Sequence, residues 1–331
     1  MYRRAVLVAL AGLSGCTGIV PFGGGSGDTS SGPGADGAGG SGERTAGTPE
    51  GSAAGESTGT PTTTGTPSAA ELSRMDVAEL LDLAKALSGK AVTAYVGGDG
   101  PLTAVSASAD AFDPSPVTEL LYRAKAAYEA ADRQGISADQ EETIQRLRQF
   151  ERLLRLAVDA QVLLVGAHTD LEELVVATDN VEPETAGSIR GRIDRRQVRA
   201  GQVVSELSRT KYAQSVGVVD RLSRTEYDDK RLQLETEVEV LGQLVDALEG
   251  VVEGITLLAR ARGRRQSGAP YAAAELGQDA EAAFVRGTNA LEDVLGGVSP
   301  QGRGFSVVGN DLLSAAEDRR SEARALHVNV A

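Results

Sequence analysis

The stretch LETEVEVLGQLVDALEGVVEGITLLA, residues 234–259, decides the fold class. Large apolar side chains recur in it at alternating steps of four and three residues, which is a heptad pattern. The predicted seam consists of Leu234, Val238, Leu241, Val245, Leu248, Val252, Ile255 and Ala259. Leu244, Val251 and Leu258 widen this stripe, so the pattern indicates a bundle helix over about 227–262 and not a two-stranded coiled coil.

A second long helix is predicted over about 138–178. Ser137-Ala138-Asp139-Gln140 has the form of a capping box, which satisfies exposed backbone amides at a helix start. Only Gly166 weakens the helical pattern that follows. At about 1.5 Å per residue, the two long helices extend over roughly 50–60 Å. Their similar length favours antiparallel neighbours in one bundle.

Shorter helices complete the pattern. Ser68-Ala69-Ala70-Glu71 is another capping box, and apolar residues at helical spacing follow it to Leu87. Gly89 either ends this helix or only weakens it before 91–96. Ser115-Pro116 is a favourable helix start. Further helices are expected over 183–207, 271–295 and 307–326, loops over 97–114, 179–183, 263–270 and 296–304, and a helix end or turn within 211–229.

The stretch before the helices has a different composition. Gly, Ser, Thr, Ala and Pro dominate residues 17–68, and no large apolar residue follows Phe22 there. Such a chain buries too little apolar surface to offset its ordering entropy, so we expect a disordered linker of about 40 Å mean extension. The Thr-rich stretch 58–67 resembles an O-glycosylated stalk, and a bare spacer is the alternative. The predicted fold is therefore all-α: an elongated antiparallel bundle of long amphipathic helices over 69–331, preceded by a disordered tether.

The amino terminus has the three parts of an export signal. Arg3 and Arg4 supply positive charge, and 5–13 supplies a short apolar core. Leu13, Ser14 and Gly15 then lead to Cys16, the only cysteine in the chain. An apolar stretch of nine residues is too short to cross a bilayer. Residues 1–15 therefore read as a signal peptide, and the twin arginine suggests the route that exports folded proteins.

This stretch resembles the precursors of haloarchaeal lipoproteins. Tyr2-Arg3-Arg4-Ala5-Val6-Leu7 is similar to their twin-arginine motif, and Leu13-Ser14-Gly15-Cys16-Thr17-Gly18 is similar to their lipobox. The resemblance covers about 20 residues. It implies cleavage before Cys16 and a thioether-linked lipid on that residue. The expected domains are a signal peptide (1–15), a lipidated linker (16–68) and a helical bundle (69–331). The expected location is the extracytoplasmic face of the cell membrane.

Composition narrows the possible functions. The formal charge is −14, and removal of residues 1–15, which hold two arginines and no acids, makes it −16. Such a charge repels nucleic acid, so no nucleic-acid partner is expected. High acid content with only five lysines is similar to proteins of saturated-salt organisms. With Cys16 carrying lipid, no thiol remains for disulfides, thiolate metal sites or a cysteine nucleophile.

His168 and Glu172 are the best candidates for a metal site. They lie one helical turn apart, and two ligands at this spacing can hold a metal. A di-iron bundle needs Glu-x-x-His pairs, however, and Val165 stands three residues before His168. The alternative is a polar residue at the edge of a packed stripe. No catalytic motif and no cofactor site is predicted.

Two groups of arginines have binding or structural interpretations. Arg190, Arg192, Arg195, Arg196 and Arg199 form a positive patch that can bind a carboxylate-rich partner or a phosphate. Alternatively, they pair with acids such as Glu172 and Glu173 across the bundle. Arg260, Arg262, Arg264 and Arg265 end the heptad helix, where positive charge suits the helix dipole. Gly250-x-x-x-Gly254 indicates local looseness or tight packing, and Gly302-Arg303-Gly304 lacks the context of a phosphate loop.

Two hypotheses of function follow. The first is a membrane-anchored lipoprotein whose bundle is a protein-binding, scaffold or accessory module of the cell envelope, with an envelope protein as partner. The second is a small-ligand or metal-binding bundle, or an enzyme, with a carboxylate site between the helices. A purely mechanical spacer is a third idea. The absence of catalytic groups beside long amphipathic helices favours the first.

Overall fold

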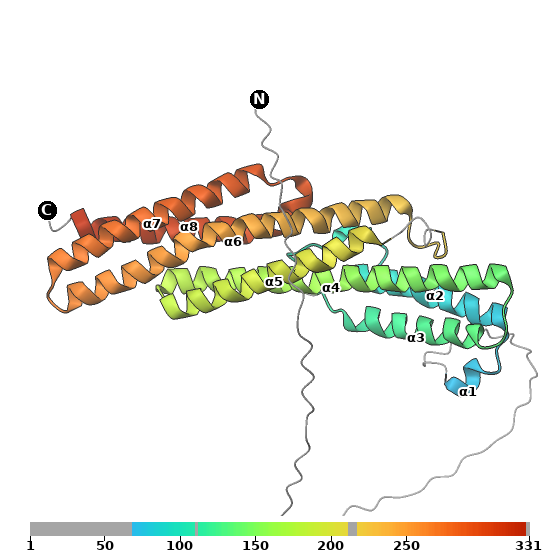
Figure 1. The fold of residues 1–331 in the computed structure, drawn as a ribbon. Coiled ribbons are helices and arrows are strands. Elements are labelled where there is room, and N and C mark those ends of the chain that lie inside the picture. Colours follow the sequence, from blue (N-terminus) through green and yellow to red (C-terminus); the bar gives the residue numbers. More distant parts are fainter. Residues whose placement is uncertain (1–67, 110–111, 211–216, 329–331) are drawn as a thin grey trace, which may run out of the picture. The chain divides into compact units, whose positions relative to one another are not determined.

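A computed structural model describes residues 68–109, 112–210 and 217–328. In these ranges the chain forms eight α-helices, two short 3-10 helices and no strand, which confirms the predicted all-α helical bundle (Figure 1). The expected signal peptide, Cys16 and the expected tether up to residue 67 lie outside the described residues. The elements are α1 (Ala69–Leu72), α2 (Val77–Val96), η1 (Leu102–Ala104), α3 (Ser115–Asp132), α4 (Ala138–Asn180), α5 (Pro183–Arg209), α6 (Arg224–Gln266), α7 (Pro270–Gly297), η3 (Pro300–Phe305) and α8 (Ser306–Val328).

Capping boxes set the start of four helices. The boxes predicted at Ser68 and Ser137 are present and begin α1 and α4. The expected first helix is, however, divided, because Asp76 forms a further box with Glu79 and begins α2 after a break. Ser223 forms the fourth box and begins α6. Each box satisfies backbone amides that would otherwise lack partners, so these positions fix the helix ends.

Glycine interrupts these helices less often than the sequence suggests. Gly89 does not end α2, which continues to Val96. The expected loop 263–270 begins late, because α6 extends through Gly263 to Gln266. The expected loop 296–304 contains η3. A glycine within a helix costs only about 1 kcal/mol, which packing elsewhere along a long helix readily offsets.

Consecutive long helices run in opposite directions. Arg152 of α4 pairs with Glu206 of α5, and Arg190 of α5 pairs with Glu249 of α6. Since α5 is antiparallel to both α4 and α6, these two 43-residue helices run in the same direction. The expectation that the two longest helices are antiparallel neighbours is therefore wrong. Their antiparallel partners are α5 and α7, to which short connections join them (Figure 1).

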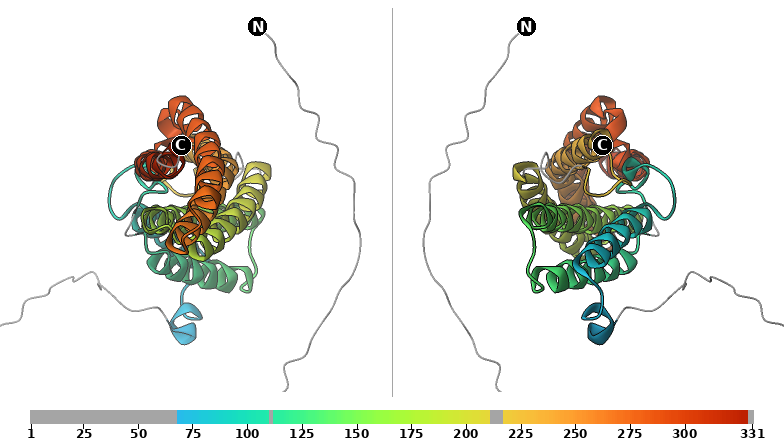
Figure 2. Two further views of the ribbon diagram at one scale, coloured as in Figure 1. Left: turned by 90° about the vertical axis from the view of Figure 1, so that its left-hand side faces the viewer. Right: turned by 90° about the vertical axis from the view of Figure 1, so that its right-hand side faces the viewer.

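Two groups of shorter helices pack on this framework. Contacts from α2 and α3 reach α4 up to its middle, where Tyr128 bonds to Glu151 and Tyr95 to Gln161. Helix α7 packs against α6 and α8, and α8 packs against α4 and α6. The end-on views show α7 and α8 on one side of α4 and α3 on the other (Figure 2). One hydrophobic core runs from Leu72 to Leu326 through all eight α-helices.

The buried seam of α6 differs from the predicted one at three positions. Leu234, Leu241, Leu248 and Ile255 are fully buried, as expected, and Val245 is buried as well. Val238, Val252 and Ala259 are only half-buried, and the second series of seam positions is Glu237, Leu244, Val251 and Leu258, each 0 % exposed. The seam continues back to Lys230 and Tyr227, which are also buried. Both series keep the seven-residue repeat, so a lysine and a glutamate occupy core positions of a leucine-rich stripe.

Glycines bring α6 and α7 to backbone contact. A Cβ added to Gly250 would lie 2.6 Å from the backbone nitrogen of Gly287, and one added to Gly254 would lie 2.8 Å from the ring of Phe284. Of the two readings of the Gly250-x-x-x-Gly254 motif, tight packing is therefore correct. No larger residue fits at this crossing without displacement of the α7 backbone.

Candidate functional site

A cluster of polar side chains lies inside the bundle, where α2, α4 and α6 meet. Its members are Tyr95, Gln161, Lys230, Gln233 and Glu237, and each is at most 6 % exposed. The heptad repeat of α6 directs Lys230 and Glu237 inward, and Gln233 lies between them on the same face. Buried polar groups carry a large desolvation cost unless they are hydrogen-bonded, so this cluster is the least expected part of the core.

The ammonium of Lys230 has a complete set of acceptors. Its Nζ donates to the carbonyl of Val105 at 2.6 Å, to Oε1 of Gln161 at 2.8 Å and to Oε1 of Gln233 at 3.0 Å. It also lies 5.4 Å from the centre of the Tyr95 ring. Three acceptors match the three donors of a protonated amine. Burial nevertheless disfavours the charge and lowers the pKa of Lys230 to about 8.

Glu237 is less completely satisfied. Oε1 accepts hydrogen bonds from the backbone amide of Ala107 at 3.2 Å and from Nε2 of Gln233 at 3.3 Å. Oε2 has no hydrogen-bond partner within the described part of the chain, and neither has Nε2 of Gln161. Burial raises the pKa of Glu237 to about 7, against the opposing effects of Lys230 and of these donors. The carboxyl group therefore titrates much closer to neutrality than an exposed glutamate does.

His168 lies next to this cluster. It follows Gln161 by one heptad on α4, as Glu237 follows Lys230 by one heptad on α6. Because α4 and α6 run in the same direction and Gln161 bonds to Lys230, His168 lies at the level of Glu237. Phe305 of η3 fills the space beside it, with the two ring centres 6.2 Å apart.

Small residues close the cluster on the side of η3. A Cβ on Gly304 would lie 2.8 Å from Oε1 of Glu237 and 3.0 Å from the backbone nitrogen of Ala107. The Gly302–Gly304 stretch, which lacks phosphate-loop context, is therefore a packing element. The cluster joins α2, α4 and α6 to the 97–114 loop and to η3. In this conformation the charged and polar groups of the cluster face one another. The cluster is therefore an internal electrostatic contact between these elements.

Sequence reasoning missed this cluster. Lys230 and Glu237 were absent from the candidate residues because charged side chains in a helix usually face solvent. One signal could have found them: Lys230, Glu237, Leu244, Val251 and Leu258 follow one another at intervals of seven. This series places two charges on an apolar stripe. Their partners, Tyr95, Gln161 and the 97–114 loop, come from distant parts of the chain and carry no comparable pattern.

The candidate pair His168 and Glu172 lies together on α4 but has no third ligand beside it among the described residues. His168 Nδ1 lies 3.7 Å from Oε1 of Glu172, and His168 is 6 % exposed. Among the residues that the structure describes, no group of three or more His, Cys, Asp or Glu side chains could hold a metal ion. The interpretation of His168 as a polar residue at the edge of a packed stripe agrees with this geometry.

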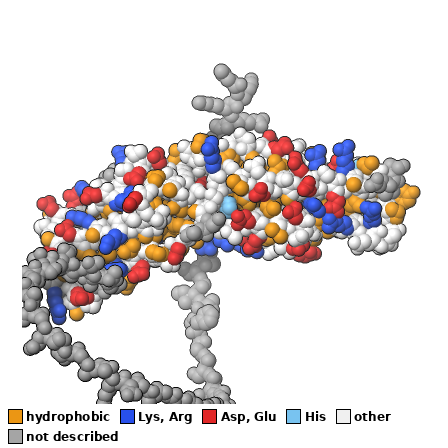
Figure 3. Space-filling view, turned by 180° about the vertical axis from the view of Figure 1, so that it is seen from behind, with side chains coloured by type: hydrophobic (Ala, Val, Ile, Leu, Met, Phe, Trp, Pro, Cys, Tyr) orange, Lys and Arg blue, Asp and Glu red, His pale blue; other side chains and the backbone are white. Residues whose placement is uncertain are grey.

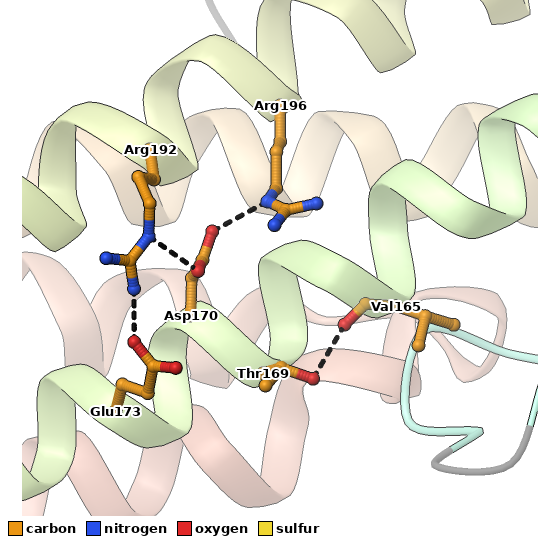
Figure 4. A network of polar contacts seen from close by, with 6 residues as sticks. All are labelled: Val165, Thr169, Asp170, Glu173, Arg192 and Arg196. Carbon is orange, nitrogen blue, oxygen red and sulfur yellow. Dashed lines mark hydrogen bonds and ion pairs between the residues drawn. The ribbon is translucent and has the colours of Figure 1, made fainter. Parts of the chain in front are cut away.

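The arginine patch of α5 is largely paired with α4. Asp170, which is 4 % exposed, accepts from Nε of Arg192 at 2.9 Å and from Nε of Arg196 at 2.7 Å. Arg192 also pairs with Glu173, and the close-up shows both guanidinium groups reaching down to α4 (Figure 4). The bonds to Asp170 raise the pKa of Arg192. The expected pairing with Glu173 is confirmed, whereas Glu172 contacts His168 instead.

A second part of the patch faces outward. Arg195 and Arg199 are exposed one turn apart on α5, and neither forms an ion pair with any residue in the described ranges. An open groove of about 1020 Å³ lies between α4 and α5, and it reaches Val198, which stands between the two arginines in sequence. It is lined by Gln149, Arg152, Val198, Gly201, Gln202, Ser205, Glu206, Arg209 and Thr210. Val198, between the two arginines in sequence, is 48 % exposed.

The arginines at the end of α6 have structural roles. Nε and Nη2 of Arg262 both bond to the carboxylate of Glu322 at 2.7 Å, which ties α6 to α8. Arg264 and Arg265 lie in the last turn, where the helix dipole favours positive charge.

On the face opposite to that of Figure 1, acidic, basic and hydrophobic side chains are interspersed (Figure 3).

Comparisons with protein-family models, with curated proteins and with solved structures find no match to this chain. None of the helices in residues 68–109, 112–210 and 217–328 has the length and apolar character needed to cross a membrane.

Proposed function

We propose that this chain is a lipid-anchored, extracytoplasmic lipoprotein whose helical bundle serves as a protein-binding, scaffold or accessory module of the cell envelope. The export signal, the lipobox ending at Cys16 and the resemblance to haloarchaeal lipoproteins support the anchor. The observation that carries the binding role is the outer face of α5. There Arg195 and Arg199 are exposed beside the α4–α5 groove without an acidic partner in the described ranges.

The chemistry of this face favours an acidic partner segment. Guanidinium groups form strong paired hydrogen bonds with carboxylates, and Val198 adds apolar contact area between them. The protein as a whole is acidic, with a formal charge of −14, so the surface is a local exception. A patch of opposite sign orients a partner and speeds its encounter more than it adds affinity. Binding of a carboxylate-rich protein segment is consistent with both points.

Cross-linking in intact cells tests the binding role. The wild-type chain should be recovered with a specific envelope protein, and the double change Arg195→Glu with Arg199→Glu should reduce this recovery about tenfold. The matched control is Arg320→Glu with Arg324→Glu, which alters charge equally at the same spacing on α8. Recovery of no protein argues against a binding module. Equal recovery with both double variants argues against the α5 face.

The anchor is tested separately. Replacement Cys16→Ser should release the protein from the membrane fraction or leave the precursor unprocessed. Mass spectrometry of the wild-type chain should show a lipid on Cys16 as the new amino terminus. An intact initiator methionine with an unmodified thiol would overturn the anchor without bearing on the α5 face.

One observation favours the second candidate, a small-ligand or metal-binding bundle. Oε2 of Glu237 and Nε2 of Gln161 are buried polar atoms without a partner in the described part of the chain. Metal analysis of the purified protein and thermal shifts with metals and small solutes test this candidate. A shift that is lost in Glu237→Gln supports it, and the absence of bound metal and of any shift rules it out.

A further inference from the structure

Residues 97–109, the part of the α2–α3 loop that directly follows α2, are hydrogen-bonded to one other stretch of the chain. These residues contain one short helical element, η1. Within the described residues, their side-chain-mediated hydrogen bonds to other segments all go to residues 221–237, whereas Asp113 and Pro114 at the end of the loop bond to Ser115 and Thr118 of α3. The four bonds are Arg221 to the carbonyl of Gly100 at 2.7 Å, Lys230 to that of Val105 at 2.6 Å, Gln233 to that of Thr103 at 3.4 Å, and the amide of Ala107 to Glu237 at 3.2 Å.

The two innermost of these contacts are made by the only cation and the only anion of the buried cluster. Lys230 is 2 % exposed and Glu237 is 0 % exposed. Leu102, Val105 and Ala107 of the loop cover them and are themselves buried. Release of the loop from α6 would expose both charged groups to water. Its closure therefore requires desolvation of an ammonium and of a carboxyl group, which is costly for whichever of them is charged.

Other elements around the pair add few charges. Tyr95 of α2 presents its ring to Lys230, and burial together with Glu237 raises the pKa of its hydroxyl well above the usual range. Helix α4 contributes Gln161 and, one heptad further, His168. Gly304 and Phe305 of η3 contribute backbone and an apolar ring, and the loop contributes peptide groups. The charged groups that act on each other are Lys230 and Glu237.

We propose that Lys230 and Glu237 form a protonation-dependent latch, which holds residues 97–109 closed on α6 and opens most readily when both groups are charged. Long loops with little secondary structure of their own are commonly functional in compact domains. Here the latch would control access to the polar interior between α2, α4 and α6. This role goes beyond binding of a partner at the α5 face.

The direction of the pH dependence follows from the two pKa shifts. The pKa of Glu237 is raised by burial, so the closed state holds a proton that the open state would lose. Closure therefore becomes more favourable as the pH falls from about 7 towards the ordinary value of 4.5. The pKa of Lys230 is lowered by burial, so closure also becomes more favourable as the pH rises from about 8 towards 10.5. Opening is most frequent between about 7 and 8.

Hydrogen exchange on the intact chain tests the latch. The measured quantity is the protection of the 102–107 segment, above all of the Ala107 amide, corrected for the intrinsic pH dependence of exchange. Protection should pass through a minimum between pH 7 and 8 and rise about tenfold by pH 5.5. The reason is that the uptake of one proton on closure changes the closing equilibrium constant by up to about tenfold per pH unit. Protection that does not vary with pH in the wild-type protein would refute the proposal, and this measurement needs no variant.

Two variants separate the two groups. Glu237→Gln keeps an oxygen acceptor for the Ala107 amide and removes the titration, so the rise in protection on the acid side should disappear. Lys230→Met should remove the rise on the alkaline side. Glu239→Gln is the matched control, since Glu239 is exposed two residues away on the same helix, and its profile should equal that of the wild type. An acid-side rise that persists in folded Glu237→Gln overturns the assignment of the latch to Glu237.

Discussion

The guanidinium of Arg196 crosses α4 directly above Gly166 and reaches Asp170 one turn further along. A Cβ on Gly166 would lie 2.7 Å from Cζ of Arg196, so a larger residue there would have to displace the guanidinium of Arg196 from this path. Nε of Arg196 then bonds to Asp170 at 2.7 Å, on the opposite oxygen from the one that Arg192 contacts. The glycine that weakens α4 as a helix former thus permits a buried carboxylate to be shared by two arginines.

Gly166→Ala should therefore destabilise the protein although alanine is the better helix former. Displacement of Arg196 leaves Asp170 with one guanidinium partner, at an expected cost of about 1–3 kcal/mol in the free energy of unfolding. Urea denaturation measures this cost. Gly187→Ala on α5 is the control, because its added Cβ meets nothing within 4 Å and should stabilise by about 0.5–1 kcal/mol. A stabilising Gly166→Ala would contradict the proposed path of Arg196.

Gly250→Ala should be more harmful than other glycine replacements on these helices. The added methyl group would meet the backbone of Gly287, which cannot move without displacing α7. Overpacking of this kind costs about 1–3 kcal/mol, measured as a lower midpoint of chemical denaturation. Gly201→Ala provides the comparison, because its Cβ would make an ordinary contact of 3.7 Å with Val238. Equal midpoints for the two variants would show that α6 and α7 are not in backbone contact.

Asp76→Ala should loosen the start of α2. The side chain of Asp76 accepts from the amide of Glu79 at 2.9 Å, and the side chain of Glu79 accepts from the amide of Asp76 at 3.0 Å. Loss of such a cap costs about 1 kcal/mol. Asp76→Ser should retain most of this stability, since serine caps helices equally well. The check is amide exchange in the first turn of α2, which should quicken in the alanine variant alone.

Lys230→Met should destabilise by about 3 kcal/mol or more, because three buried oxygen acceptors each lose the hydrogen bond from the ammonium at once. Lys125→Met serves as the reference, since the side chain of Lys125 is 41 % exposed and faces one glutamate at 3.9 Å. That exchange should change the free energy of unfolding by less than about 0.5 kcal/mol. Thermal denaturation of the three proteins at one pH gives the comparison. A small effect of Lys230→Met would mean that water replaces the ammonium.

Local chemistry in the sequence predicted much of the fold. The caps at Ser68 and Ser137, the helix start at Ser115-Pro116 and the long apolar stripe of α6 all have short-range causes, and the structure contains each of them. The errors are also local. The cap at Asp76 is hidden in the sequence because apolar residues continue on both sides of it, and Gly263 suggests a helix end because glycine often ends helices, although α6 continues through it.

The candidate site could not be predicted in the same way. Tyr95 bonds to Gln161 across 66 residues, and Ala107 bonds to Glu237 across 130 residues. Packing of the whole bundle decides which helices face one another, and the sequence pattern of a single helix does not contain this information. Residue type alone favours Val238 over Glu237 as a seam position. The register of α6 is decided instead by its packing against α4, α5 and α7 together.

The polar pair has a further consequence for how the helices find their alignment during folding. Seams made only of leucine and valine tolerate sliding by whole heptads, because every residue then meets another of its kind. A slip of α6 by seven residues against α4 would place the ammonium of Lys230 opposite Leu154 or His168, without the oxygen of Gln161. We infer that Lys230 and Glu237 select a single register of α6 against α4. In a variant with leucine at both positions, doubled NMR signals from Leu154 would show that two registers are populated. A single set of signals would contradict this inference.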